Sequence, residues 1–212
     1  MKIKPILFST AMVEAILKGR KTQTRRVIKS RHESGMFQVS KTLDGIVTGI
    51  TSLDWDERPK NDNCNDIKPI ANVGDILWVR ETWQDLQCFD YNMKGFAYKA
   101  DEHSSKHAKE YKIRWKPSIF MPKEAARIFL KITNVRVERL QDISIEDVCS
   151  EGLSSNLMEH DACCELSDKW ESLWCKINGA DSWESNPWVW AYDFEKVERP
   201  ANFLRESEAV NA

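Results

Sequence analysis

The chain has 212 residues, of which 42% are hydrophobic and nine are tryptophans, and its 31 Lys and Arg residues almost balance its 33 Asp and Glu residues. This length and composition predict one domain with a buried core and exclude a chain that is disordered throughout. Because the formal net charge is only −2, attraction to a polyanion must come from a local cluster of cations and not from an overall basic excess.

A strand, a helix and a basic segment open the chain. Residues 6–8 predict a short buried strand, and Ser9 or Thr10 can cap a helix that ends at Gly19. Residues 19–26 read Gly-Arg-Lys-Thr-Gln-Thr-Arg-Arg. Four cations in eight residues are typical of a surface that meets an anion such as a phosphate, although cations after a helix also complement its dipole.

Apolar residues are sparse in the next part of the chain. Residues 36–42 and 46–50 flank Asp44-Gly45, which predicts a hairpin, and residues 54–69 have the composition of a surface loop. We therefore predict an insertion over residues 30–72.

The middle of the chain predicts strands separated by connections. A Gly-Asp turn starts an apolar strand over residues 73–83. Residues 104–112 are polar and predict a connection. Prolines bracket residues 115–122, which favours an extended or turning segment over a helix.

A long strand and a short helix follow. Residues 128–140 alternate with β-branched side chains and predict a strand with an irregularity near Asn134. Ser144 begins a capping-box-like pattern that predicts a short helix ending near Gly152.

The last part of the chain has the clearest helical periodicity. Residues 161–176 predict an amphipathic helix, residues 188–197 a final strand, and residues 198–212 a polar tail. The order of these elements predicts a mixed α+β fold around a small β-barrel, with helices flanking it.

The sequence also bears on location and cofactors. No window approaches the roughly 18 apolar residues of a membrane span, and residues 1–5 do not begin a signal peptide, so we expect a cytoplasmic protein without a membrane partner. The six cysteines have no regular spacing and predict reduced thiols. The cluster of His160, Cys163, Cys164 and Cys175 lacks a C-x-x-C pair, so we expect no structural metal and no cofactor.

Three stretches together resemble the ASCH domain of the PUA-like superfamily, in the form found in phages and prophages. They are residues 19–26, residues 73–81 and the strand and helix over 135–152. The resemblance covers residues 4–197 as a single domain that carries the 30–72 insertion. It implies a small β-barrel with flanking helices and a cleft that binds RNA or a nucleotide.

Some small ASCH proteins remove the acyl group from N4-acetylcytidine with a lysine, a threonine and a glutamate. The resemblance assigns these roles to Lys21, Thr24 and Glu151, with Glu146 or Glu81 as alternatives for the carboxylate. It therefore implies an amidohydrolase that acts on a modified nucleoside.

Binding residues follow from the same motifs. The expected phosphate- or substrate-binding side chains are cations, one carboxylate and one aromatic ring: Arg20, Arg25, Arg26, Arg80, Glu81 and Trp78. Two alternatives to an enzyme stay open. The chain is then either a non-catalytic RNA-binding module, or a protein of phage–host interaction that uses the 30–72 insertion as a partner surface.

Amide hydrolysis sets conditions on these residues. Thr24 can act as the nucleophile and Lys21 as its base only if the pKa of the lysine falls well below its usual value, to which burial and the neighbouring arginines would contribute. Glu151 would exchange a proton with the leaving amine. In a regular strand, Lys21 and Thr24 face opposite sides, so this hypothesis requires a turn or bulge between them.

Overall fold

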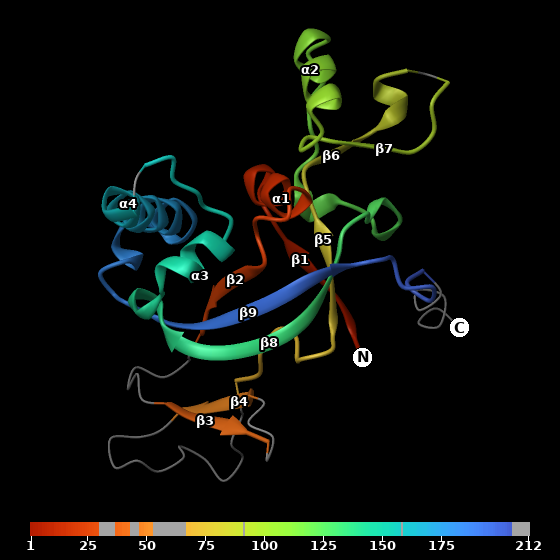
Figure 1. Cartoon of the computed structure of the whole chain (residues 1–212). Coiled ribbons are helices and arrows are strands. Elements are labelled where there is room, and N and C mark those ends of the chain that lie inside the picture. The colour runs from red at the N-terminus through yellow and green to blue at the C-terminus, as the bar shows by residue number, and fades with distance from the viewer. Residues whose placement is uncertain (30–36, 43–46, 53–66, 91, 158, 205–212) are drawn as a thin grey trace. The chain divides into compact units, whose positions relative to one another are not determined.

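The computed structural model describes residues 1–29, 37–42, 47–52, 67–90, 92–157 and 159–204 (Figure 1). Its nine strands and four α-helices within this part of the chain confirm a mixed α+β fold. The fold divides into two compact units, each built from separated stretches of chain. The first unit comprises Met1–Gly19, Asp75–Lys131 and Glu195–Ala212, and the second comprises Arg20–Gly74 and Ile132–Phe194.

The first unit contains a three-stranded ladder and a hairpin. β1 (Ile3–Leu7) pairs in parallel with β5 (Ile76–Arg80), which pairs antiparallel with the start of β8 (Phe129–Arg139). β6 (Trp83–Asp85) and β7 (Phe96–Tyr98) form the antiparallel hairpin. β5 is buried along almost its whole length, which explains why its sequence is nearly continuous in apolar residues.

The predicted first helix is confirmed, together with its start and end. α1 spans Thr10–Leu17, and the Ser9 side chain accepts a hydrogen bond from the Met12 backbone at 3.4 Å. Gly19 follows with φ of +72°, a conformation that glycine adopts without a steric penalty.

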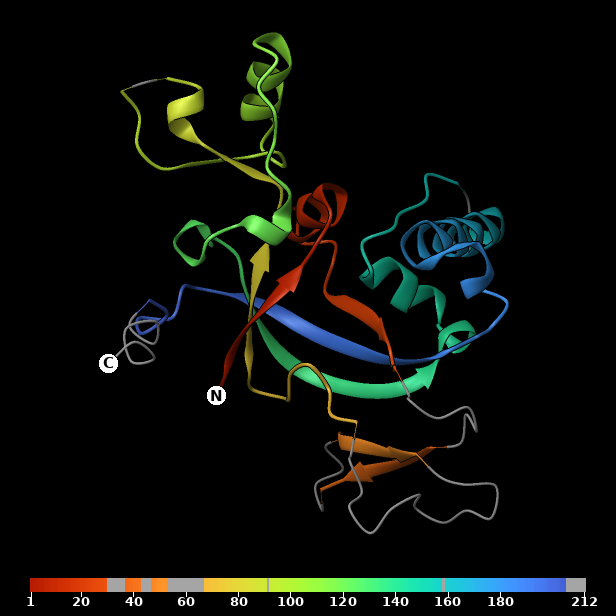
Figure 2. The ribbon, with the colours of Figure 1, turned by 180° about the vertical axis from the view of Figure 1, so that it is seen from behind.

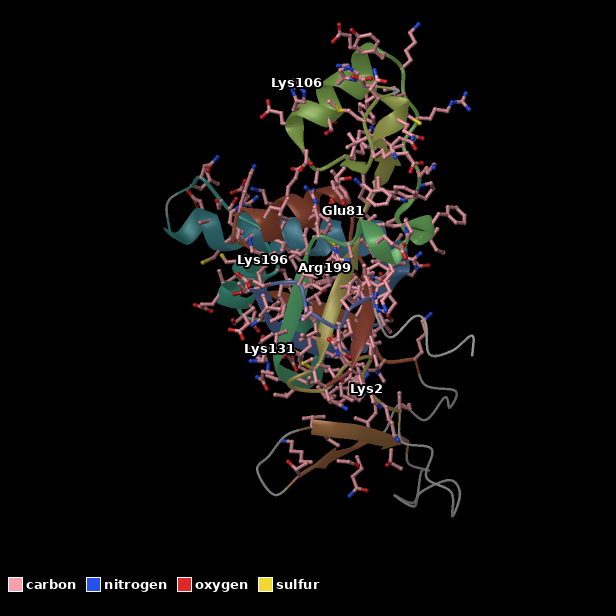
Figure 3. The ribbon with its side chains drawn as sticks, turned by 90° about the vertical axis from the view of Figure 1, so that its right-hand side faces the viewer. Lys2, Glu81, Lys106, Lys131, Lys196 and Arg199 are labelled. Carbon is pink, nitrogen blue, oxygen red and sulfur yellow. The ribbon has the colours of Figure 1, made fainter. Side chains whose placement is uncertain are left out.

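The predicted connection over residues 104–112 is wrong, because the structure has a helix there. α2 spans Glu102–Glu110 and lies beside the β6–β7 hairpin (Figure 1). Ala108 is its one buried residue, so the sequence carries no apolar periodicity that would indicate a helix. An exposed pair, Glu102 and Lys106, joins successive turns at 2.7 Å, and Lys106 projects outward (Figure 3).

Aromatic side chains dominate the core of the first unit. Phe203 is fully buried and packs edge-on against Trp78 and Phe129. The predicted polar tail over residues 198–212 therefore contributes a core residue. The buried members of this core are Ile76, Trp78, Trp83, Met121, Ala125, Ala126, Phe129 and Phe203.

The second unit contains the rest of the sheet. β2 (Gln23–Val27) pairs antiparallel with β9 (Trp188–Val197), and β9 neighbours β8. Figures 1 and 2 show β8 and β9 side by side as the two long strands. Within the described residues no sheet closes into a barrel, and β1 and β2 are edge strands. The strand pattern predicts which segments are extended, but it does not specify closure.

The predicted hairpin of the insertion is also present in the second unit. β3 (Phe37–Lys41) pairs antiparallel with β4 (Val47–Ser52). Their predicted turn at Asp44-Gly45 lies outside the described residues. Ile50 is completely buried and forms a backbone bridge with Ile67.

Two helices complete the second unit. α3 spans Ile145–Ser150, and its cap is the Ser144 side chain, which accepts from the Asp147 backbone at 3.2 Å as predicted. α4 spans Glu159–Asn178 and lies beside α3 (Figure 1). Their shared core consists of Leu140, Val148, Leu166, Trp170, Trp174 and Val189. In the described part of the chain, the structure shows no helix with the length and apolarity that crossing a membrane requires.

Candidate functional site

A buried ion pair joins the basic segment to the end of α3 in the second unit. Lys21 lies just before β2 and forms a single backbone bridge with Glu151, the residue that follows α3. Lys21 Nζ donates to Glu151 Oε2 at 2.5 Å and to the Glu151 carbonyl oxygen at 2.9 Å. Lys21 is 2% exposed and Glu151 4%. The structure thus brings together two of the three predicted catalytic side chains.

The surroundings of Lys21 act on its pKa in opposite directions. Burial lowers the pKa of the Lys21 ammonium, Glu151 opposes this, and the charges of Arg26 and Arg25 add to the lowering. The net direction is downward. Burial and like charge are the two effects that make a lysine amine available as a base near neutral pH.

Arg25 is the centre of a buried network of carboxylates. Its Nε donates to Glu138 at 2.7 Å, its Nη2 to Asp147 at 2.7 Å, and its Nη1 to both Glu151 and Gln23 at 3.2 Å. Burial disfavours the charged guanidinium, but the three carboxylates outweigh burial and raise the pKa of Arg25. All three guanidinium nitrogens of Arg25 thus donate to side chains of the protein itself. The sequence predicts that Arg25 binds a phosphate or substrate.

Thr24 and Arg26 lie on the other face of β2. Thr24 is 1% exposed, and its Oγ1 accepts from Arg26 Nη1 at 2.9 Å. The same Arg26 nitrogen donates to the Arg25 carbonyl oxygen at 2.9 Å. Burial lowers the pKa of Arg26, while Glu151 acts in the opposite direction. Arg26 therefore bonds the predicted nucleophile, Thr24, and interacts electrostatically with both Lys21 and Glu151.

Contacts along β2 bear on the required approach of Lys21 to Thr24. Side-chain contacts two residues apart, Arg25 to Gln23 and Arg26 to Thr24, show that residues 23–26 alternate as a strand does. Lys21 precedes this strand. Between them Thr22 donates its N–H to the Ser150 carbonyl at 2.8 Å, so the ladder changes partner from the end of α3 to β9. Lys21 and Arg25 nevertheless share Glu151, whereas Thr24 bonds Arg26, so these contacts group Lys21 with Arg25 and not with Thr24.

The other predicted residues of the second unit lie at its surface. Arg20 is exposed, and its Nη1 donates to the Gly152 carbonyl at 2.8 Å. Glu146 is exposed in the first turn of α3, where hydrogen bonds from its own backbone N–H and from Ser144 lower its pKa. Glu151, and not Glu146, is the carboxylate bonded to Lys21.

Glu81 belongs to the first unit and lies beyond the end of β5 (Figure 3). It is 1% exposed, and both of its carboxylate oxygens accept from Arg127, at 2.9 and 3.0 Å. Arg127 also bonds Asp101 at 2.8 Å and stacks on the Tyr98 ring at 3.8 Å. Burial raises the pKa of Glu81, and Arg127 opposes this. Burial also raises the pKa of Tyr98, to about 12.

Trp78 and Arg80 lie on β5 in the same unit. The Arg80 guanidinium is 5.6 Å from the centre of the Trp78 ring, and Arg80 Nη2 donates to the Ile119 carbonyl. Trp78 is only 8% exposed and contacts Phe203 edge-on. The structure places the Trp78 ring in the core, where a nucleic-acid base cannot stack on it without rearrangement.

Sequence reasoning missed the carboxylates that surround Arg25. Asp147 lies on α3 and precedes Glu151, the residue that caps the end of α3, by four positions, a spacing that places both on one side of the helix. Glu138 follows Arg136 by two residues on β8, so both point to the same face. Arg136 Nη2 also donates to Asp147, at 3.0 Å. These spacings are the signals in the sequence that indicate a shared ionic network.

Cysteines and possible metal ligands can be located within the described residues. Five cysteines are free thiols, and Cys64 lies outside the described residues. Among the residues that the structure describes, no group of three or more His, Cys, Asp or Glu side chains is arranged to hold a metal ion.

Comparisons with known proteins leave the class of this protein open. No family model matches the chain. No curated protein matches it either. The chain is similar to a solved structure, protein EF3133 of Enterococcus faecalis V583, from the family DUF984, with a TM-score of 0.37 and 10% sequence identity. That similarity covers 95% of this chain and 83% of the other, and at this level it shows neither a shared fold nor a shared function.

Proposed function

We propose that the chain is an ASCH-type, PUA-like protein that removes an acyl group from an N4-acylated cytidine. The resemblance of the Gly19–Arg26, Val73–Glu81 and Val135–Gly152 motifs supplies the reaction and the residue roles. The buried contact between Lys21 Nζ and Glu151 Oε2 at 2.5 Å is the observation that supports it most strongly. A lysine with a lowered pKa beside a carboxylate is suited to moving protons in a water-poor site.

The proposed reaction proceeds through an ester on Thr24. Neutral Lys21 takes the hydroxyl proton as Thr24 Oγ1 bonds to the acyl carbon. The bond from that carbon to N4 then breaks, and N4 leaves as the amine of cytidine with a proton from the Lys21–Glu151 pair. Water hydrolyses the ester, releases the carboxylic acid and restores the threonine.

Arg26 has a defined part in this proposal. Its Nη1 already donates to Thr24 Oγ1, so it stabilises negative charge on that oxygen as the proton leaves. Its charge also lowers the pKa of Lys21. Thr24 and Lys21 are 1% and 2% exposed, so the reaction requires a local rearrangement that exposes both side chains to the substrate.

The test is acetate release from N4-acetylcytidine by the purified protein, compared with K21M, T24V and E151Q. We expect release by the wild type and a loss of more than about a hundredfold in each variant. K106M is the matched control, because it removes a lysine that is paired with a glutamate at 2.7 Å on the surface of α2. Wild-type release no greater than that of K21M would exclude the proposed activity. RNA binding that weakens with salt, in the absence of release, would instead favour a non-catalytic module.

A further inference from the structure

Arg25 connects three carboxylates that come from different places in the second unit. Glu138 lies on β8, Asp147 lies on α3, and Glu151 follows α3. The contacts are 2.7, 2.7 and 3.2 Å, and the Arg25 side chain is completely buried. A planar guanidinium can hold several carboxylates in fixed directions, which the single ammonium of a lysine cannot do.

The third of these contacts bears directly on Lys21. Glu151 Oε1 accepts from Arg25, and Glu151 Oε2 accepts from Lys21. The two oxygens of one carboxylate are thus held by two different cations. Arg25 itself is anchored by Glu138 and Asp147, so its own orientation does not depend on Lys21.

We propose that Arg25 is a positioning residue for the Lys21–Glu151 pair, and that it holds Glu151 Oε1 so that Oε2 faces Lys21 Nζ. The catalytic role of the Lys21–Glu151 pair rests on the proposed function. The positioning itself is a property of the fold, and it has a readout without substrate.

Arg25 also influences the charge of Lys21. The charged or titratable groups around the pair lie on β2, β8, α3 and β9, and they are Arg25, Arg26, Arg136, Glu138, Asp147, Tyr192 and Asp193. Arg25 and Arg26 lower the pKa of Lys21, whereas Glu151 raises it. Replacing Arg25 with a neutral residue removes one cation and leaves three carboxylates without their shared partner. Both changes raise the pKa of Lys21.

The first experiment follows the titration of the Lys21 amine by NMR in wild type, R25Q and R136Q, with the signal assigned by its absence in K21M. We expect a higher pKa in R25Q. R136Q is the matched control, because Arg136 contacts Glu138 and Asp147, as Arg25 does, while its third carboxylate is Asp193 and not Glu151. A wild-type titration in R25Q, or an equal shift in R136Q, would overturn the proposal.

The second experiment uses R25K, which keeps a cation beside the carboxylates and is the variant expected to fold. A lysine cannot span Glu138, Asp147 and Glu151 together, so Glu151 loses its fixed orientation. We expect the ammonium protons of Lys21 to exchange with water at least about tenfold faster than in wild type, because a held hydrogen bond protects them. Unchanged exchange in R25K would overturn the positioning role.

Turnover separates this inference from the proposed function. If Arg25 acts through Glu151, the acid limb of kcat/KM moves to higher pH in R25Q, so that activity below the limb falls about tenfold for each unit of movement. A purely structural defect lowers activity without moving the limb. Absence of acetate release by the wild type would refute the hydrolase but leave the titration and exchange experiments as tests of positioning.

Discussion

The free energy of the Lys21–Glu151 contact can be measured with a double-mutant cycle of K21M, E151Q and the double variant. Each partner is almost completely buried, and they meet at 2.5 Å. Removing one partner of a buried pair typically costs about 3–5 kcal/mol, because it breaks the contact inside a water-poor site. The two single variants therefore differ in what surrounds the remaining charge: E151Q leaves Lys21 close to Arg26 and Arg25, whereas K21M leaves Glu151 bonded to Arg25.

E151Q leaves Lys21 buried near two cations, Arg26 and Arg25, without the carboxylate that opposes them. We expect it to reduce the free energy of unfolding by about 3–5 kcal/mol near neutral pH. K21M leaves Glu151 bonded to Arg25, so its cost is smaller, about 1–3 kcal/mol. The cycle should give a favourable coupling of about 1–3 kcal/mol between the two side chains.

The loss of unfolding free energy in E151Q depends on pH, and its direction follows from the pKa of Lys21. Without Glu151, burial and the two arginines hold the pKa of folded Lys21 further below the ordinary lysine value of 10.5. Between the folded and unfolded pKa values the unfolded chain binds more protons, so the free energy of unfolding rises with pH, by up to about 1.4 kcal/mol per pH unit. The E151Q deficit therefore shrinks as pH rises.

Urea unfolding followed by tryptophan fluorescence, at about pH 6 and about pH 9.5, measures all four proteins of the cycle. Lys106→Met with Glu102→Gln forms the control cycle, since this pair has a similar separation of 2.7 Å but side chains that are 76% and 82% exposed. We expect no measurable coupling there. A buried-pair coupling near zero, or an E151Q deficit that grows with pH, would refute the reasoning.

Three further predictions concern single side chains. T24V should lower acetate release more than about a thousandfold while changing the free energy of unfolding by only about 1 kcal/mol, because it removes the proposed nucleophile and one hydrogen bond; urea unfolding and turnover check the two parts. S144A should cost about 1 kcal/mol in thermal unfolding, since the Ser144 hydroxyl caps α3, and an unchanged Tm would contradict this. Y192F should cost about 1–3 kcal/mol in urea unfolding, because it removes the buried hydroxyl that accepts from the Ile70 N–H; a Y192F protein as stable as wild type would show that another group satisfies this N–H.

Local patterns in the sequence predict most elements of the second unit. The strand over residues 188–197 matches β9, and Ser144 caps the predicted short helix. These elements have a period or a capping residue that depends on neighbours in sequence. The sequence did not predict α2, because this helix has no apolar periodicity: Ala108 is its one buried residue. Helix propensity and the exposed i,i+4 pair of Glu102 and Lys106 favour the helix instead.

Partners across the fold were harder to predict than the elements. The basic segment indicates an anion, and in the structure the anions nearest to Arg25 are the protein's own carboxylates from β8 and α3. Nothing local in the segment distinguishes a phosphate from Glu138 or Asp147, since both offer oxygens to a guanidinium. The four-residue spacing of Asp147 and Glu151, at the end of α3, was the available signal. It becomes informative only when β2 is known to contact that helix.

The cations of the basic segment differ in the groups that they contact, and therefore in how strongly they could attract an external anion. Arg25 is neutralised by three carboxylates, so it adds little attraction for an external anion, whereas Arg20 is exposed and bonds only the Gly152 carbonyl among its described contacts. Lys21 lies between these two cases, paired with one carboxylate and close to two cations. Burial disfavours the charged form of Lys21, and this weakens the attraction that the ammonium could offer a phosphate. A general base acts through its neutral form, so the same effect of burial is the one on which the proposed role of Lys21 as a base depends.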